Sequence, residues 1–187
     1  MNTTTKLLIA LGLLTGAGVL IFKQKPPTKS DADMPTIGIL QTASHPALDA
    51  ARDGFIETLN QELNGKVQFV LRNAEGSIPA AHTIAQNFKA HNLDGIFAIA
   101  TPAAQAVASQ EKNKPIFIAA VTDPQAAGIC NENVCGCTDM ISLDKTIDLL
   151  QELLPNAQTI ALLANSGEIN SQVQVERMQE ILNARGI

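Results

Sequence analysis

The stretch Ile96-Phe97-Ala98-Ile99-Ala100-Thr101-Pro102 decides the fold of this 187-residue chain. An apolar run ends at a hydroxyl residue, and a proline follows directly. Proline suits the first turn of a helix, where its missing N–H is not needed, and a threonine before it can cap the helix. We therefore predict a buried strand at 95–100 that leads at once into a helix at 102–110.

The same arrangement occurs twice more along the chain. Thr36-Ile37-Gly38-Ile39-Leu40 leads through a polar turn to Pro46, and the apolar run 116–121 leads to Thr122-Asp123-Pro124. Continuous apolar runs are typical of a parallel sheet that helices cover on both faces. The carboxyl ends of its strands share one edge, where helix N-termini offer N–H groups and partial positive charge. This edge is the predicted place for a small anionic group.

Strands and helices alternate over the rest of the chain, as hydrophobic periodicity and helix boundary signals indicate. We predict strands at 36–41, 66–72, 95–100, 116–121, 134–138 and 159–164, and helices at 46–63, 77–90, 102–110, 144–154 and 168–184. The predicted fold class is α/β, with a doubly wound parallel sheet in a first lobe at 31–138. Residues 139–187 are expected to begin a second α/β lobe, which one strand and two helices cannot complete.

Residues 1–30 are set apart from this pattern. Residues 7–22 carry no charge, and a linker rich in lysine and proline follows them. The run is slightly shorter than the roughly 20 residues of a comfortable membrane span and longer than most signal-peptide cores. We predict a signal peptide or a membrane anchor in the inner membrane, with the anchor slightly favoured, and a periplasmic or otherwise extracytoplasmic location.

Composition and motifs exclude several classes of function. The net charge of -5 and the aromatic content of 3%, without Trp or Tyr, argue against a nucleic-acid partner. The chain has no G-x-G-x-x-G, no G-x-x-x-x-G-K-[ST], no G-x-S-x-G and no metal-binding pair of histidines. We therefore expect no cofactor, no metal site and no enzymatic activity.

Four segments together resemble the ABC transporter substrate-binding proteins of the tryptophan/tyrosine-type family. They are PTIGILQTASHPALDAARDGF (35–55), AIATPAAQA (98–106), AVTDPQAAG (120–128) and ANSGEINSQVQVE (164–176). The resemblance implies a type I periplasmic-binding fold, in which two α/β lobes close on a small ligand and deliver it to a membrane permease and its ATPase. It favours an aromatic amino acid as the ligand. The alternatives are a membrane-tethered sensor or interaction module, or a truncated remnant of the same fold.

Nine residues are candidate ligand contacts, because they lie just after predicted strands: Gln41, Thr42, His45, Thr101, Ala103, Thr122, Asp123, Asn165 and Glu168. Each position has a structural alternative. The hydroxyl of Thr101 and the N–H of Ala103 suit a carboxylate, or Thr101 only caps its helix. In the first loop, His45 contacts the ligand or forms a local cap with Ser44.

Three further candidate residues also remain open between ligand contact and local structure. Asp123 suits an ammonium group, but an aspartate before a proline is also an ordinary helix start. Asn165 and Glu168 would meet the ligand from the second lobe on closure, or form a plain turn with Gly167.

The three cysteines lie close together in the sequence. Cys130 and Cys135 flank a predicted bend, so an exported chain can join them in a disulfide. Cys135 and Cys137 fall in a predicted strand, so burial is the alternative. No fourth soft ligand accompanies the three cysteines, and this argues against zinc.

Overall fold

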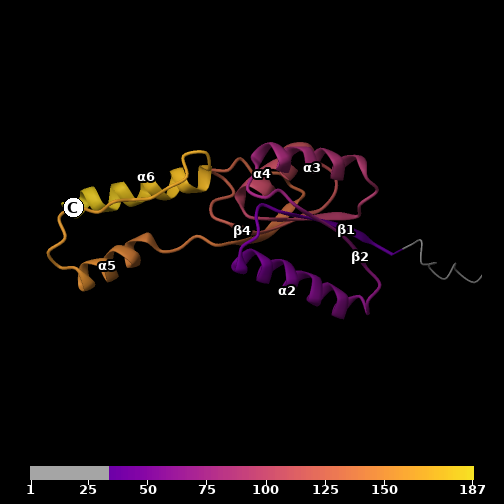
Figure 1. The fold of residues 1–187 in the computed structure, drawn as a ribbon, viewed down its shortest axis with the longest axis horizontal. Helices are drawn as coiled ribbons and strands as arrows, with labels where there is room; N and C mark the ends of the chain where they lie inside the picture. Colours follow the sequence, from indigo (N-terminus) through magenta and orange to yellow (C-terminus); the bar gives the residue numbers. More distant parts are fainter. Residues whose placement is uncertain (1–33) are drawn as a thin grey trace, which may run out of the picture. The chain divides into compact units, whose positions relative to one another are not determined.

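Five parallel strands form the centre of the computed structural model, which describes residues 34–187 (Figure 1). The strands are β1 Thr36–Gln41, β2 Gln68–Asn73, β3 Gly95–Ile99, β4 Ile116–Val121 and β5 Val134–Thr138. They lie in the order β2-β1-β3-β4-β5, and every neighbouring pair is parallel. This arrangement confirms the predicted α/β class with a parallel sheet.

Helices cover both faces of the sheet (Figure 1). The helices are α2 Pro46–Glu62, α3 Ile78–Ala90, α4 Thr101–Gln110, α5 Leu143–Leu153 and α6 Ile169–Ala184. α2 lies on one face, whereas α3 and α4 lie side by side on the other. The sheet is therefore doubly wound. β1 continues through α2 to β2 on one side, and β3 continues through α4 to β4 on the other side. The direction of the strand order therefore reverses between the neighbouring strands β1 and β3.

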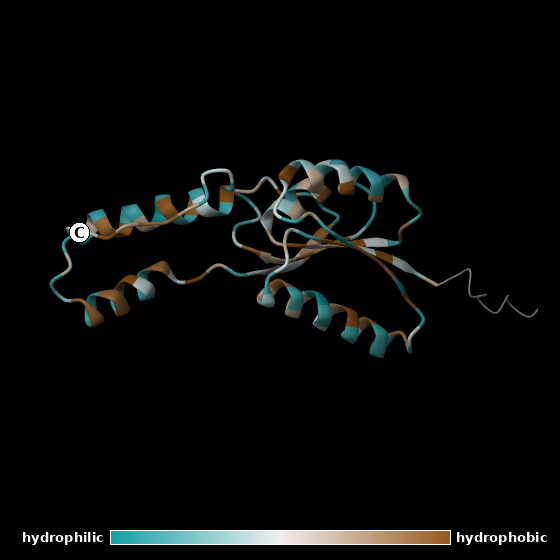
Figure 2. Cartoon of the chain, viewed as in Figure 1, coloured by the Kyte–Doolittle hydropathy of each residue, from teal (hydrophilic) through white to brown (hydrophobic). Residues whose placement is uncertain are grey.

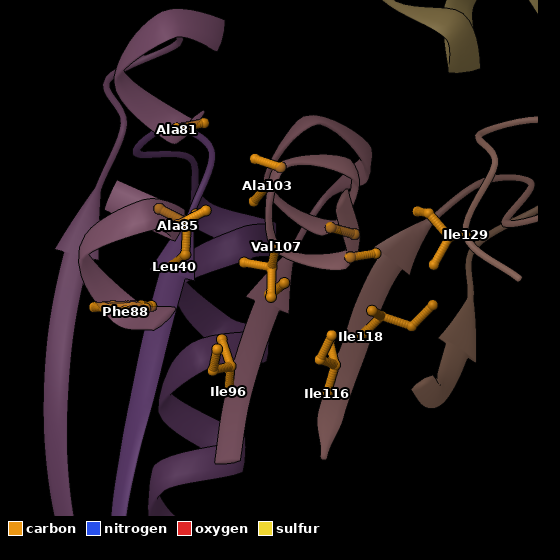
Figure 3. Packing of buried hydrophobic residues seen from close by; sticks show 14 of the residues in the cluster. Leu40, Ala81, Ala85, Phe88, Ile96, Ala103, Val107, Ile116, Ile118 and Ile129 are labelled. Atoms are coloured by element: carbon orange, nitrogen blue, oxygen red, sulfur yellow. The ribbon is translucent and has the colours of Figure 1, made fainter. Parts of the chain in front are cut away.

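Each face of the sheet has its own buried core. Under α3 and α4, Phe88, Val107 and Ile96 belong to one cluster of buried side chains (Figure 3). Under α2, Phe55 stacks on Phe97 with ring centroids 4.0 Å apart. Rings at this separation and nearly parallel add a small gain beyond their burial.

Gly38 in β1 is required by close packing. A Cβ at this position would come within 2.7 Å of Leu93 Cδ1 and 3.0 Å of the Phe88 ring. The missing side chain lets α3 approach the strand closely, and this close approach buries both large residues.

The predicted elements differ from the structure at two places. Residues 159–164 form no strand, because no neighbouring strand in the described part of the chain pairs with their backbone groups. Pro124 opens a single turn rather than a helix, since Gly128 adopts a left-handed conformation at φ 70° and ends the turn.

For clarity, we call residues 34–138 the sheet region and residues 139–187 the C-terminal segment. Backbone contacts join both into one unit, so the predicted lobe boundary after residue 138 stays a prediction. The predicted signal or anchor at 7–22 lies outside the described residues. Among residues 34–187, no helix combines the length and apolar character that a membrane crossing needs.

Candidate ligand-binding site

The switch between β1 and β3 brings Thr42 to the start of α4. The Thr42 hydroxyl donates a hydrogen bond to the carbonyl of Ile99 (3.0 Å) and accepts one from the N–H of Ala103 (3.1 Å). Thr42 therefore caps α4 from a different loop. Thr42 and Ala103, both predicted ligand contacts, therefore lie together, but they are hydrogen-bonded to each other. Their contact with a ligand stays a prediction.

The junction between β3 and α4 holds a strained residue. Ala100 has φ 73° and ψ 161°, a combination that is essentially restricted to glycine. Ala120, near the end of the neighbouring strand β4, also has a positive φ of 54°. Such strain costs about 1–3 kcal/mol per residue and gathers at ligand-binding edges. Thr101, directly after Ala100, is only 2% exposed.

Gln41 is a structural residue in this arrangement. Its side-chain amide donates hydrogen bonds to Asp49 (2.8 Å) and to the carbonyl of Ala43 (2.7 Å). Its oxygen accepts a hydrogen bond from Arg52 (3.1 Å). Only 1% of Gln41 is exposed, so its polar atoms order the first loop from inside.

His45 caps the start of α2. Its Nδ1 accepts a hydrogen bond from the N–H of Ala47 at 3.2 Å, and the ring is exposed. Ser44 faces the neighbouring loop instead, where its hydroxyl accepts a hydrogen bond from Asn73 (2.9 Å). His45 therefore forms the predicted local cap without Ser44.

Asp123 holds an arginine of α6. One carboxylate oxygen accepts a hydrogen bond from the N–H of Ala126 (3.0 Å), and the other accepts one from Arg177 Nη2 (2.7 Å). Thr122, directly before it, is buried. The carboxylate that we predicted to bind an ammonium group thus has a guanidinium partner in the structure. Ligand contact by Thr122 and Asp123 stays a prediction.

Asn165 and Glu168 form a turn before α6. The Asn165 amide donates a hydrogen bond to Glu168 Oε1 (2.9 Å), and its oxygen accepts one from the N–H of Gly167 (3.0 Å). The second oxygen of Glu168 accepts a hydrogen bond from Asn170 (3.3 Å). The structural alternative, a turn around Gly167, is therefore present, and it holds the Glu168 carboxylate in place.

This turn lies against the helices of the sheet region. Gly167 and Glu168 line a cavity of about 280 Å³ together with residues near the starts of α3 and α4. Those residues include Ile78 and His82 on α3 and Pro102 and Gln105 on α4. The lining also extends along α4 and past its end to Lys112. Positive partial charge at the two helix starts thus lies on the same cavity as the Glu168 carboxylate.

Sequence reasoning missed the side chains of α3 and α4 that line this cavity. His82 is half-buried and contributes to the cavity wall. Gln105 and Ser109 follow Pro102 at helical spacing on one side of α4, and Lys112 lies just after the end of the helix. That spacing is the signal in the sequence that indicates a shared polar face.

The cysteines are exposed free thiols in the structure. The alternative that Cys135 and Cys137 are buried is wrong. Both are exposed, because they lie on β5, the edge strand of the sheet. No bridge joins Cys130 to Cys135 in the structure, and the disulfide stays a prediction. Within residues 34–187, no cluster of three or more His, Cys, Asp or Glu side chains is arranged to hold a metal ion.

Comparison with known proteins adds to this geometry. The family model described as ABC transporter substrate binding protein matches residues 36–187. The tyrosine-binding protein of Clostridioides difficile (strain R20291) is 39% identical over 155 residues, which are 77% of this chain and 44% of that protein.

Two solved structures are also similar. A conserved domain protein from Vibrio cholerae O1 biovar El Tor has a TM-score of 0.78 at 32% identity. An ABC domain from Streptococcus pneumoniae in complex with L-Trp has a TM-score of 0.77 at 34% identity. In both comparisons the match covers 82% of this chain and 55% of the other. The chain thus spans about half the length of its relatives.

Proposed function

Because the chain belongs to the family of ABC transporter substrate-binding proteins, we propose that it binds an amino acid, with an aromatic one favoured. It would hand this ligand to the permease and ATPase of an importer, outside the cytoplasm. Relatives in the family support the ligand class, since one is a tyrosine-binding protein and another was solved with L-Trp. The binding family also agrees with the absence of enzyme motifs in the sequence.

The observation that carries the proposal is the cavity between the helix starts and the 165–168 turn. Its volume of about 280 Å³ is near the lower end of small-molecule pockets, which begin at roughly 300 Å³. A site of this size suits a ligand as small as an amino acid. Its walls come from two regions distant in sequence, as a site between two lobes requires.

Charges around the cavity suit a zwitterion. The starts of α3 and α4 favour a carboxylate, and Lys112 adds a positive charge to the cavity wall. Glu168 favours an ammonium group, and its two oxygens are already oriented by Asn165 and Asn170. We therefore place the ligand's carboxylate toward the helices and its ammonium toward Glu168.

The mechanism would be conformational rather than covalent. A ligand that touches both regions stabilises the arrangement in which they are close, because only that arrangement makes both sets of contacts. We propose that the boundary after residue 138 separates two lobes that move in this way. The closed form would be the one that docks on the permease.

Titration calorimetry of the purified protein with L-Trp, L-Tyr and L-Leu tests the proposal. We expect binding of an aromatic amino acid, and a loss of about tenfold or more in Glu168→Gln, since a hydrogen bond to a charged group is lost. Glu176→Gln, at an exposed position of α6, is the matched control. A folded protein that binds none of these ligands would contradict the proposal and favour the sensor, interaction-module or remnant alternative.

A further inference from the structure

Arg177 connects the C-terminal segment to the sheet region at one defined point. We propose that its ion pair with Asp123 is a positioning contact that holds the 165–168 turn against α4 and so forms the ligand cavity. This inference rests on the proposed function for its effect on affinity. Its effect on the turn itself does not depend on any ligand.

The pair is well placed to fix an orientation. Arg177 Nη2 lies 2.7 Å from Asp123 Oδ2, and Asp123 Oδ1 is held by the N–H of Ala126. The carboxylate therefore has little freedom to turn. Arg177 Nη1 also lies 3.9 Å from the sulfur of Met140, in the connection between β5 and α5. One guanidinium thus contacts the loop after β4 and the connection that leads into the C-terminal segment.

α6 transmits this contact to the cavity. Ile169, at the start of the helix, packs against the core of the sheet region. Arg177 lies eight residues further along, which corresponds to about 12 Å of helix. Two separated attachments fix both the position and the direction of a helix. The turn that carries Glu168 immediately precedes Ile169. The position of this turn against α4 therefore depends on the attachments at Ile169 and Arg177.

No other ion pair in the described part of the chain joins the sheet region to the C-terminal segment. Arg185, directly after the last residue of α6, pairs with Asp144 and Asp148 of α5, within the C-terminal segment. The arginine within α6 and the arginine at its C-terminal end therefore have separate roles. Arg177 joins two regions, whereas Arg185 joins two helices of one region.

The location of Asp123 argues against direct ligand contact. Its side chain is 17% exposed, and it does not line the cavity that contains Glu168. One of its oxygens already pairs with the Arg177 guanidinium, whereas no ion pair in the described part of the chain includes Glu168. Asp123 therefore acts through Arg177 and α6, and Glu168 is the acidic group that faces the ligand.

Two variants test the positioning role. Arg177→Gln removes the cation, and Asp123→Asn removes the charge while the amide oxygen can still accept the hydrogen bond from Ala126. In the ligand-free protein we expect faster amide hydrogen exchange at 165–170 in both variants. We also expect a few-fold weaker binding of the aromatic amino acid in each, because Arg177 is 48% exposed and ion pairs exposed in this way contribute little.

The double variant and a charge exchange complete the test. Arg177→Gln with Asp123→Asn should weaken binding no further than either change alone, because both remove the same contact. Asp123→Arg with Arg177→Asp should restore part of the slow exchange. Arg185→Gln is the matched control and should leave exchange at 165–170 unchanged.

The outcomes separate this inference from the proposed function. If the unmodified protein binds no amino acid, the proposed function fails, and the exchange data still decide the role of Arg177. Unchanged exchange at 165–170 in Arg177→Gln would overturn the positioning role. Tighter amino-acid binding in that variant would also overturn it, because Arg177 would then compete with the ligand's ammonium for Asp123.

Discussion

The sheet region and the C-terminal segment differ sharply in how much of their apolar surface is buried. Among the described residues, only Leu143, Ile147 and Leu182 of the buried hydrophobic side chains lie after residue 138. Both α5 and α6 alternate apolar and polar residues along their length (Figure 2). Yet Leu153 is 70% and Leu163 104% exposed. An apolar pattern is thus enough to form a helix, but burial needs a facing element.

The largest expected contrast comes from shortening one apolar side chain in each region. Ile96→Ala removes a fully buried side chain between β3 and α4, and we expect a loss of about 2–5 kcal/mol in the free energy of unfolding. Leu153→Ala should change it by less than about 0.5 kcal/mol, because the side chain is largely exposed. Urea denaturation followed by circular dichroism measures both. Equal losses of unfolding free energy in Ile96→Ala and Leu153→Ala would contradict the difference in burial between the two regions.

A second variant weakens the pairing of β5, the last strand before the C-terminal segment. Gly136→Ala would place a Cβ 2.0 Å from the carbonyl oxygen of Ile118, so β5 must shift away from β4. We expect a loss of about 1–3 kcal/mol, typical of overpacking. The control is Gly54→Ala in α2, where a Cβ meets nothing within 4 Å and a modest gain is expected. A stable Gly136→Ala protein with unchanged exchange at 134–138 would show that β5 tolerates the side chain.

Acid should destabilise the sheet region through Glu111. Burial by itself raises the pKa of Glu111, but hydrogen bonds from the N–H groups of Asn113 and Lys114 and the Lys114 ammonium outweigh it and lower the pKa below its ordinary value of 4.5. Because the folded pKa is the lower one, this stability is fully present above about pH 4.5. It is lost as the pH falls through the folded pKa.

Glu111→Gln should therefore cost about 1 kcal/mol at pH 7 and flatten the pH dependence of the melting temperature below pH 5. Glu152→Gln, at an exposed position of α5, should leave both the stability and its pH dependence unchanged. Melting curves between pH 3 and pH 7 check this pair. If the melting temperature of Glu111→Gln fell with pH as it does in the unmodified protein, carboxylates other than Glu111 would be responsible for the loss of stability in acid.

The smallest effect is expected at Leu163. Leu163→Ser replaces a fully exposed leucine in residues 159–164, and we expect the free energy of unfolding to change by less than about 0.5 kcal/mol. Binding of a hydrophobic dye should decrease, since exposed apolar area is removed. A loss above 1 kcal/mol in thermal unfolding would mean that Leu163 is packed in solution and that the two regions differ less than the structure indicates.

Local signals in the sequence were sufficient where an element is stabilised by its immediate neighbours. The apolar run at 96–100 followed by Thr101-Pro102 predicted β3 and α4 within a residue at each end, because caps and continuous apolar runs act locally. Residues 159–164 have a similar apolar pattern but form no strand. A strand is stabilised by hydrogen bonds to a neighbour, and no local pattern supplies that neighbour.

The candidate site was harder to predict than the fold. Proline and threonine after the strands located the edge, and Glu168 was identified from its loop. Sequence reasoning could not show that Thr42 bonds to Ala103 or that Arg177 pairs with Asp123. These partners are 61 and 54 residues apart, so only the folded backbone brings them together.

The sequence by itself determined the α/β class, the order of the elements in the sheet region and the edge of the sheet that carries the polar loops. It could do so because periodicity, caps and turns depend on residues close in the chain. Only the tertiary structure decided which polar groups bond to one another and which line a cavity. It also decided that Glu168 lines the same cavity as residues at the helix starts, while Asp123 pairs with Arg177. The physical reason is that a side chain's role depends on the partners within hydrogen-bond distance, and here those partners come from distant parts of the sequence.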